Sequence, residues 1–201
     1  MIDFLFTNPV TFVIWAVSLL IAVTIHEFSH AFVADKLGDP TPRVLGRVTL
    51  NPLAHLDPLG TIALLIAHIG WGKPVPFDPY NLQNPKRDSL FIALAGPASN
   101  FILAGILALF VRFLPGISFF IIPLLIINIG LGVFNLMPVP PLDGSKILAG
   151  ILPKMQALEW EQFSTRYSMI LLLIFVFPFS GRSLASMIVS PIINTILNFL
   201  L

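Results

Sequence analysis

A long apolar run that contains two histidines and a glutamate is the feature that most constrains this chain. Residues 9–37 hold few polar side chains outside the segment HEFSH, which runs from His26 to His30. About 20 apolar residues suffice for a helix to cross a bilayer, so the run predicts a membrane-spanning helix. Gly38 predicts where that helix ends. Ionisable side chains within such a helix are costly, and they indicate a functional site.

The spacing of the two histidines favours a metal site. His26 and His30 are four residues apart, so they fall on one face of the helix and can bind the same ion. Glu27 lies one position further round the helix, close enough to reach a water molecule on that ion. The simpler interpretation is two core histidines with a hydrogen-bonded glutamate. The membrane setting favours the metal, because burying these groups in lipid needs a reason.

The composition places the chain among membrane proteins. Apolar residues make up 56% of its 201 residues and charged residues 10%, against roughly 25% charged in a typical soluble domain. We expect one domain over residues 1–201 and no nucleic-acid partner, because no basic cluster is present. The chain has no cysteine, which excludes disulfides, thiolate metal ligands and a cysteine nucleophile.

The apolar segments predict an all-α polytopic fold, a bundle of about five to six hydrophobic segments. After residues 9–37 they are 60–69, 88–113, 117–136, 167–179 and 184–200. Segment 60–69 is too short to cross a bilayer and is predicted to be re-entrant or interfacial. Alternating residues in 43–51 and the proline-rich stretch 73–79 predict a small extended element near the cytoplasmic face.

The distribution of positive charge predicts the orientation in the cell membrane. If segment 60–69 does not cross, three loops share one side: 35–58, 71–87 and 144–166. Those loops hold nine lysines and arginines, and the other side holds two, Arg112 and Arg182. Cytoplasmic loops carry the excess of such residues, so the N-terminus is expected outside and the C-terminus in the cytoplasm. His26, His30 and Asp143 then all lie toward the cytoplasmic side.

A third metal ligand must come from elsewhere in the chain, and Asp143 is the best candidate. It follows an apolar helix in the segment NLMPVPPLDG, whose prolines exclude regular helix and hold the chain extended. The simpler interpretation is a capping aspartate in an ordinary turn. Asp78 is a competing candidate on the same side. His55 is interpreted as a loop histidine bonded near Asp57, and His68 as buried or interfacial.

Three motifs together resemble the site-2 protease family of intramembrane zinc metalloproteases. They are HEFSH at 26–30, AGPASN at 95–100 and NLMPVPPLDG at 135–144. The resemblance implies one Zn²⁺ per chain, held by His26, His30 and Asp143. It also implies Glu27 as the general base and Asn135 as a donor to the oxyanion. The chain is similar to the short branch of the family, with a catalytic core at about 9–144 and a helical hairpin at about 165–201.

The function implied is zinc-dependent endopeptidase cleavage of membrane-embedded protein segments by metal-activated water. The partners would be transmembrane protein substrates and the lipid bilayer. The extended stretches 43–51 and 73–79 could bind an unwound substrate as an added strand. Two alternatives stay open: a membrane protein that binds or transports metal, and a relative that binds transmembrane helices without cutting them. Glu27 argues against the first, and the complete set of catalytic side chains argues against the second.

Overall fold

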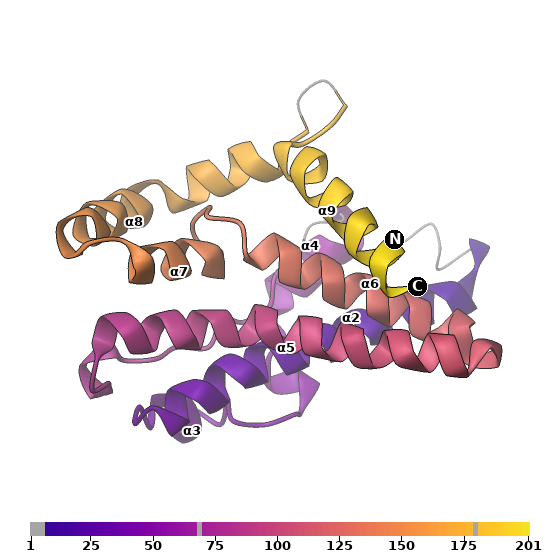
Figure 1. Ribbon diagram of the computed structural model, residues 1–201, viewed down its shortest axis with the longest axis horizontal. Coiled ribbons are helices and arrows are strands. Elements are labelled where there is room, and N and C mark those ends of the chain that lie inside the picture. The colour runs from indigo at the N-terminus through magenta and orange to yellow at the C-terminus, as the bar shows by residue number, and fades with distance from the viewer. Residues whose placement is uncertain (1–6, 68–69, 179–180) are drawn as a thin grey trace.

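Every regular element in the described part of the chain is a helix. The computed structural model describes residues 7–67, 70–178 and 181–201 (Figure 1). The α-helices are α2 (Pro9–Lys36), α3 (Thr41–Val44), α4 (Pro58–Ala67), α5 (Pro85–Phe113), α6 (Ser118–Asn135), α7 (Asp143–Ile151), α8 (Lys154–Val176) and α9 (Leu184–Leu200). Short 3₁₀ turns occur at Pro52–Ala54, Pro79–Asn81 and Pro115–Ile117.

Three of these helices are long and apolar enough to cross a membrane. They are α2 with 28 residues, α5 with 29, and the 21 residues Pro115–Asn135 that include α6. Helix α4 has 10 residues, about 15 Å of helix, which is half of the roughly 30 Å needed. Helix α9 has 17 residues and is also shorter than a typical span. The chain is therefore a multi-pass membrane protein, and segment 60–69 is too short to cross, as its length predicts.

Helix α5 runs along the molecule and organises the other spans. Figure 1 shows α6 beside its C-terminal half and α7 beside its N-terminal half. A side chain at Gly132 would meet the ring of Phe101, and one at Gly150 would meet Leu90, so glycines let both neighbours approach closely. The main core joins α5, α6, α8 and α9. Its buried residues are Ala104, Leu107, Ala108, Leu125, Ile129, Val133, Leu142, Phe175, Ala185 and Val189.

Asp39 ties together the loops at one end of the bundle. Its fully buried carboxylate accepts hydrogen bonds from the Thr41 N–H and hydroxyl, the Asn81 amide and the Asp78 N–H. Burial raises the pKa of Asp39, but these four donors outweigh burial and lower it below its usual range. The segment that follows α2 and the segment that precedes α5 therefore meet at the same end of the bundle. Helix α4 lies between these two segments in the sequence.

A second contact brings the start of α5 to the end of α7. The Lys86 ammonium donates to the Leu152 carbonyl oxygen. The loops after α2, before α5 and after α7 consequently lie at one end of the bundle.

The predicted small extended element is wrong for the described residues. They contain no named strand, and Leu56 and Gly72 pair only through an isolated bridge. Thr41–Val44 is helical because Asp39 accepts from the Thr41 N–H and because prolines suit the first positions of a helix. Gly46 then turns the chain with a φ of 67°. Residues 73–78 are irregular and have no strand partner.

The C-terminal region also differs from the expectation. Helix α7 was not predicted, and α8 begins at Lys154, well before the apolar segment expected at residue 167. Hydropathy alone misses α7 and the first half of α8 because charged and polar residues break the apolar run there. The Trp160 indole N–H donates to the carbonyl and hydroxyl oxygens of Ser145, at 3.0 and 3.1 Å, and so ties α8 to α7.

Candidate metal centre

The two histidines of α2 face the same point, as their spacing predicts. His26 and His30 are 4% and 7% exposed, and their ring centroids lie 4.6 Å apart at an interplanar angle of 85°. The two Nε2 atoms are 3.1 Å apart. This edge-on arrangement directs one nitrogen of each ring toward a shared position beside the helix.

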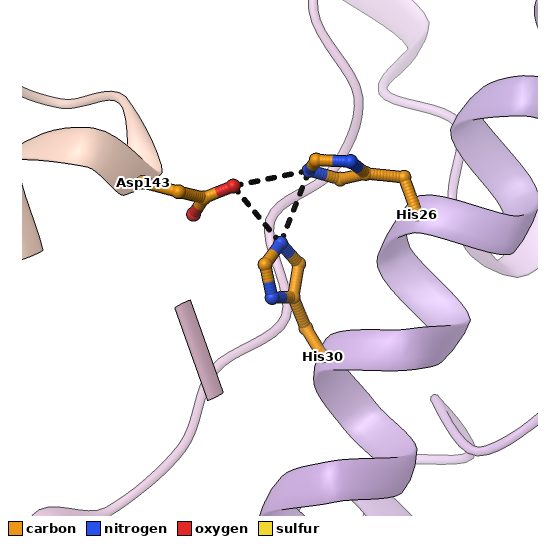
Figure 2. A group of neighbouring side chains, drawn as sticks. All are labelled: His26, His30 and Asp143. Atoms are coloured by element: carbon orange, nitrogen blue, oxygen red, sulfur yellow. Dashed lines mark hydrogen bonds and ion pairs between the residues drawn. The ribbon is translucent and has the colours of Figure 1, made fainter. Parts of the chain in front are cut away.

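Asp143 completes the group from the first residue of α7. Its Oδ2 lies 3.1 Å from Nε2 of His26 and 3.1 Å from Nε2 of His30, as Figure 2 shows. Asp143 is 8% exposed. Among the described residues this is the one group of three histidine, aspartate or glutamate side chains whose ligand atoms converge in this way. The grouping expected from the sequence is therefore present in the fold.

Hydrogen bonds behind the histidines decide which nitrogen faces the centre. The Nδ1–H of His30 donates to the Ile92 carbonyl oxygen at 2.6 Å, and the Nδ1–H of His26 donates to Oδ1 of Asn100 at 2.6 Å. Both partners are acceptors, so each Nδ1 carries the hydrogen and each neutral ring turns a lone pair on Nε2 inward. Two nitrogen lone pairs and a carboxylate oxygen of Asp143 thus meet without a hydrogen between them. Such a donor set fits a bound cation.

The spacing of the three atoms fits zinc. Zinc binds histidine nitrogen and carboxylate oxygen at about 2.0–2.2 Å in tetrahedral geometry, which places ligand atoms about 3.3–3.6 Å apart. The three separations here are each 3.1 Å, so a small expansion would admit the ion. Three protein ligands also leave a fourth position for water or substrate, which is the pattern of catalytic zinc sites.

Gly96 of the AGPASN segment provides the space that the centre needs. A Cβ at this position would lie 2.6 Å from Cε1 of His26 and closer still to Nε2 of His30. Even a methyl group would therefore push against the two rings. The close neighbours of Gly96 are therefore the two histidines themselves.

Replacing Gly96 with alanine is expected to weaken zinc binding about 5- to 150-fold, because overpacking costs about 1–3 kcal/mol and the rings must move to relieve it. The measurement is zinc affinity of the purified protein in competition with a chelator. Gly105→Ala is the matched control, since this residue lies in the same helix with no atom within 4 Å of its added Cβ. Equal affinity in both variants would contradict the packing argument.

Gly144 positions the third ligand. A Cβ here would clash with the backbone carbonyl oxygens of Leu136 and Met137, so only glycine lets the start of α7 lie against the end of α6. Short turns join the two helices, with Val139 N–H donating to the Met137 carbonyl oxygen and Leu142 N–H to that of Val139. Asp143 is thereby brought into the group. Its carboxylate also lies in the first turn of α7, where negative charge is favoured.

Glu27 lies beside the metal group and is held by a loop. Its Oε2 accepts a hydrogen bond from the Val75 N–H at 3.2 Å. Gly72 brings the same loop close, since a Cβ there would lie 3.7 Å from Oε1 of Glu27. Glu27 also interacts electrostatically with His30. The carboxylate is thus near the histidines but outside the group of three, as a proton-transferring residue requires.

Arg47 is a buried cation near this carboxylate that the sequence analysis did not single out. It is 4% exposed, it donates to the Lys73 carbonyl oxygen, and its Nε has no hydrogen-bond partner. Burial lowers the pKa of its guanidinium, and the negative charge of Glu27 opposes that shift. No motif marks Arg47 in the sequence, because its proximity to Glu27 arises only from the fold of the loops.

Asn135 is the last residue of α6, beside the turn that leads to α7. Its Nδ2 donates to the Leu131 carbonyl oxygen of its own helix at 3.0 Å. An amide nitrogen carries two hydrogens, so one remains for another acceptor. The structure places Asn135 near the end of the span that presents Asp143 but gives no contact between its side chain and the group of three.

The other candidates stand apart from the metal group. His55 is fully buried, with Nε2 bonded to the Thr49 carbonyl oxygen at 2.8 Å, so it is a hydrogen-bonded loop histidine as interpreted. The Asp78 carboxylate accepts from the Tyr80 N–H at 3.0 Å and caps a short turn. His68 lies outside the described residues. The structure therefore gives Asp78 no part in the group.

An apolar helical bundle with a buried centre of two histidines and one aspartate is the arrangement of a membrane protein with a metal centre. A family model described as peptidase family M50 matches residues 14–121 and 115–177. The Bacillus subtilis protein "Putative zinc metalloprotease YwhC" is 35% identical over 190 residues, covering 89% of this chain and 84% of that protein. The chain belongs to peptidase family M50, the site-2 protease-like zinc metalloproteases.

Two longer proteins are similar over part of their length. "Putative zinc metalloprotease Rip2" of Mycolicibacterium smegmatis is 35% identical over 148 residues, which are 66% of this chain and 55% of that protein. "Zinc metalloprotease MJ0392" of Methanocaldococcus jannaschii is 31% identical over 151 residues, which are 73% of this chain and 37% of that protein. No solved structure was found to match the chain.

Proposed function

We propose that His26, His30 and Asp143 bind one catalytic zinc ion and that Glu27 and Asn135 act on the substrate beside it. The observation that carries the proposal is the meeting of three buried lone-pair atoms, each 3.1 Å from the others. The protein would then be an endopeptidase that cuts membrane-embedded segments of other proteins. A carboxylate ligand suits this setting, because its negative charge offsets part of the charge on the ion.

A zinc ion held by His26, His30 and Asp143 would supply a water molecule that is acidic near neutral pH and a Lewis acid for the scissile carbonyl. Glu27 takes up the proton of the attacking water and later passes it to the leaving amine. The Val75 N–H on Oε2 fixes the direction of the carboxylate. Asn135 donates its second amide hydrogen to the oxygen of the substrate carbonyl as negative charge develops there.

The proposed substrate must be unwound before it is cut, because a helix shields its peptide bonds with its own hydrogen bonds. The loop 73–78 is poorly suited to bind it by strand addition. Pro74 and Pro76 have no N–H, and the N–H groups of Lys73, Val75 and Asp78 already donate to groups of this protein. The loop offers mainly carbonyl oxygens to a substrate strand, and residues 43–51 begin in a helical turn and contain no strand.

The proposed orientation places the metal end of the bundle toward the cytoplasm. Its support is the excess of lysine and arginine in loops that lie together at that end. Because the chain has no native cysteine, single cysteines can report sidedness.

Cysteines at Gln83 and Gln156 are expected to react with an impermeant reagent from the cytoplasmic side only, and one at Gly116 from outside only. All three positions are exposed. Residue 116 lies between α5 and α6, at the end of these helices away from the metal centre, whereas residue 83 precedes α5. Labelling in right-side-out and inverted vesicles makes the comparison. Reaction of position 83 from outside would contradict the proposed orientation.

The function is tested with purified protein and a model substrate with a single transmembrane helix. We expect cleavage within the membrane segment, loss of cleavage after zinc is removed with a chelator, and recovery when zinc is added back. Zinc binding without cleavage of several such substrates would favour a metal-binding protein. Substrate capture without cleavage or zinc binding would favour a non-cleaving relative.

A further inference from the structure

Two buried asparagines connect the metal centre to α6. The side chains of Asn100 in α5 and Asn128 in α6 are both fully buried, and Nδ2 of Asn100 donates to Oδ1 of Asn128 at 2.8 Å. Amides in an apolar span cost free energy unless their polar atoms are paired. Asn100 accepts from the ring of His26, but Asn128 touches none of the three ligands, so its pairing with Asn100 needs an explanation.

The hydrogen bonds run in one direction through three helices. Nδ2 of Asn128 donates to the Leu124 carbonyl oxygen at 2.8 Å, which leaves Oδ1 facing Asn100. Nδ2 of Asn100 donates both to that oxygen and to the Ala22 carbonyl oxygen, at 2.8 and 3.3 Å. Both amide hydrogens of Asn100 thus point away from His26, and its Oδ1 accepts from the Nδ1–H of that ring at 2.6 Å.

If the Asn100 amide were reversed, a donor would face a donor or an acceptor would face an acceptor at every contact. Its NH₂ would face the Nδ1–H of His26, and its oxygen would face the oxygens of Asn128 and Ala22. The acceptor on Asn128 therefore helps to select the orientation in which Asn100 accepts from His26. That bond turns Nε2 of His26 toward His30.

We propose that Asn128 is a positioning residue for the metal centre, acting through the Asn100 amide on the ring of His26. The proposal rests on the zinc site proposed above. Partners behind a metal-binding histidine fix the orientation of its ring, and their loss commonly weakens metal binding about 10- to 100-fold. Asn128 contacts Asn100 and not the histidine itself. Its effect on zinc binding therefore depends on how freely the Asn100 amide can rotate when the acceptor on Asn128 is lost.

Asn128→Leu is expected to weaken zinc binding about 10-fold or more, at the lower end of that range. Leucine has the same branching as asparagine and suits the apolar span, but it is bulkier and offers no acceptor. The measurements are zinc affinity by competition with a chelator and the visible absorption of the Co²⁺-loaded protein, which reports the geometry of the ligands. Asn128→Val, which also lacks an acceptor, replaces this variant if the longer side chain prevents folding.

Two substitutions separate orientation from simple loss of packing. Asn128→Asp in its neutral form can still donate to the Leu124 carbonyl oxygen and accept from Asn100, so we expect it to keep zinc. Asn100→Asp, added to Asn128→Leu, should restore zinc binding, because a carboxyl group presents an oxygen to His26 whichever way it faces. A purely structural role for Asn128 predicts no such rescue.

Thr24→Val is the matched control for losing a buried polar group, because the Thr24 hydroxyl bonds only to the Leu20 carbonyl oxygen of its own helix. It should bind zinc like the wild type. Wild-type affinity and Co²⁺ absorption in folded Asn128→Leu, or failure of Asn100→Asp to rescue it, would overturn the proposal. A wild-type protein that binds no zinc would instead overturn the proposed function.

Discussion

Replacing Glu27 with glutamine is expected to abolish proteolysis while leaving zinc in place. Glutamine keeps the shape of the side chain but cannot accept a proton at neutral pH, and a general base commonly contributes about 10²–10⁴-fold to the rate. His26, His30 and Asp143 do not depend on Glu27 for their mutual contacts. The expected loss of rate is therefore at least of that order, with unchanged zinc content.

The measurements are the rate of cleavage of the single-span substrate and the zinc content by elemental analysis. Glu161→Gln is the matched control, because this exposed glutamate of α8 lies outside the metal group. It should cleave at the wild-type rate. Near wild-type cleavage by Glu27→Gln would remove the proposed mechanism, and loss of zinc would mean that Glu27 also supports the ligands.

Removing a ligand is expected to abolish zinc binding together with proteolysis. His26→Ala, His30→Ala and Asp143→Ala should each lose zinc as well as activity. Loss of a partner behind a ligand costs about 10- to 100-fold in metal affinity, so loss of a ligand itself should exceed that range. Asp143→Ala is the most informative of the three, because its ligand role rests on a contact between residues 117 positions apart.

Asp78→Ala is the control for Asp143→Ala. Asp143 begins α7, whereas Asp78 precedes the short turn Pro79–Asn81 and its carboxylate caps that turn through the Tyr80 N–H. We expect Asp78→Ala to keep one zinc ion per chain. Full zinc occupancy in Asp143→Ala would show that another residue supplies the third ligand.

Much of the fold could be predicted from local patterns. The spans α2, α5 and α6 follow from apolar runs longer than a bilayer requires, and the helical repeat places His26 and His30 on one face. The limits of this approach appear at α7 and α8, whose charged residues interrupt the apolar pattern. The prediction of an extended structure after Thr41 was wrong for another reason. Asp39 and two prolines favour a helical turn there, despite the alternating pattern of the side chains.

The sequence by itself determined the spans, the pair of histidines on one face and the choice of Asp143 as a third ligand candidate. The tertiary structure decided which atoms meet. It pairs Asn100 with His26 across 74 residues, clears the space for the rings at Gly96, and sets Val75 against Glu27. The physical reason is that local spacing defines the face of one helix, whereas contacts between helices depend on their rotation and closest approach. Those quantities are set by packing along the whole length of α2, α5 and α6.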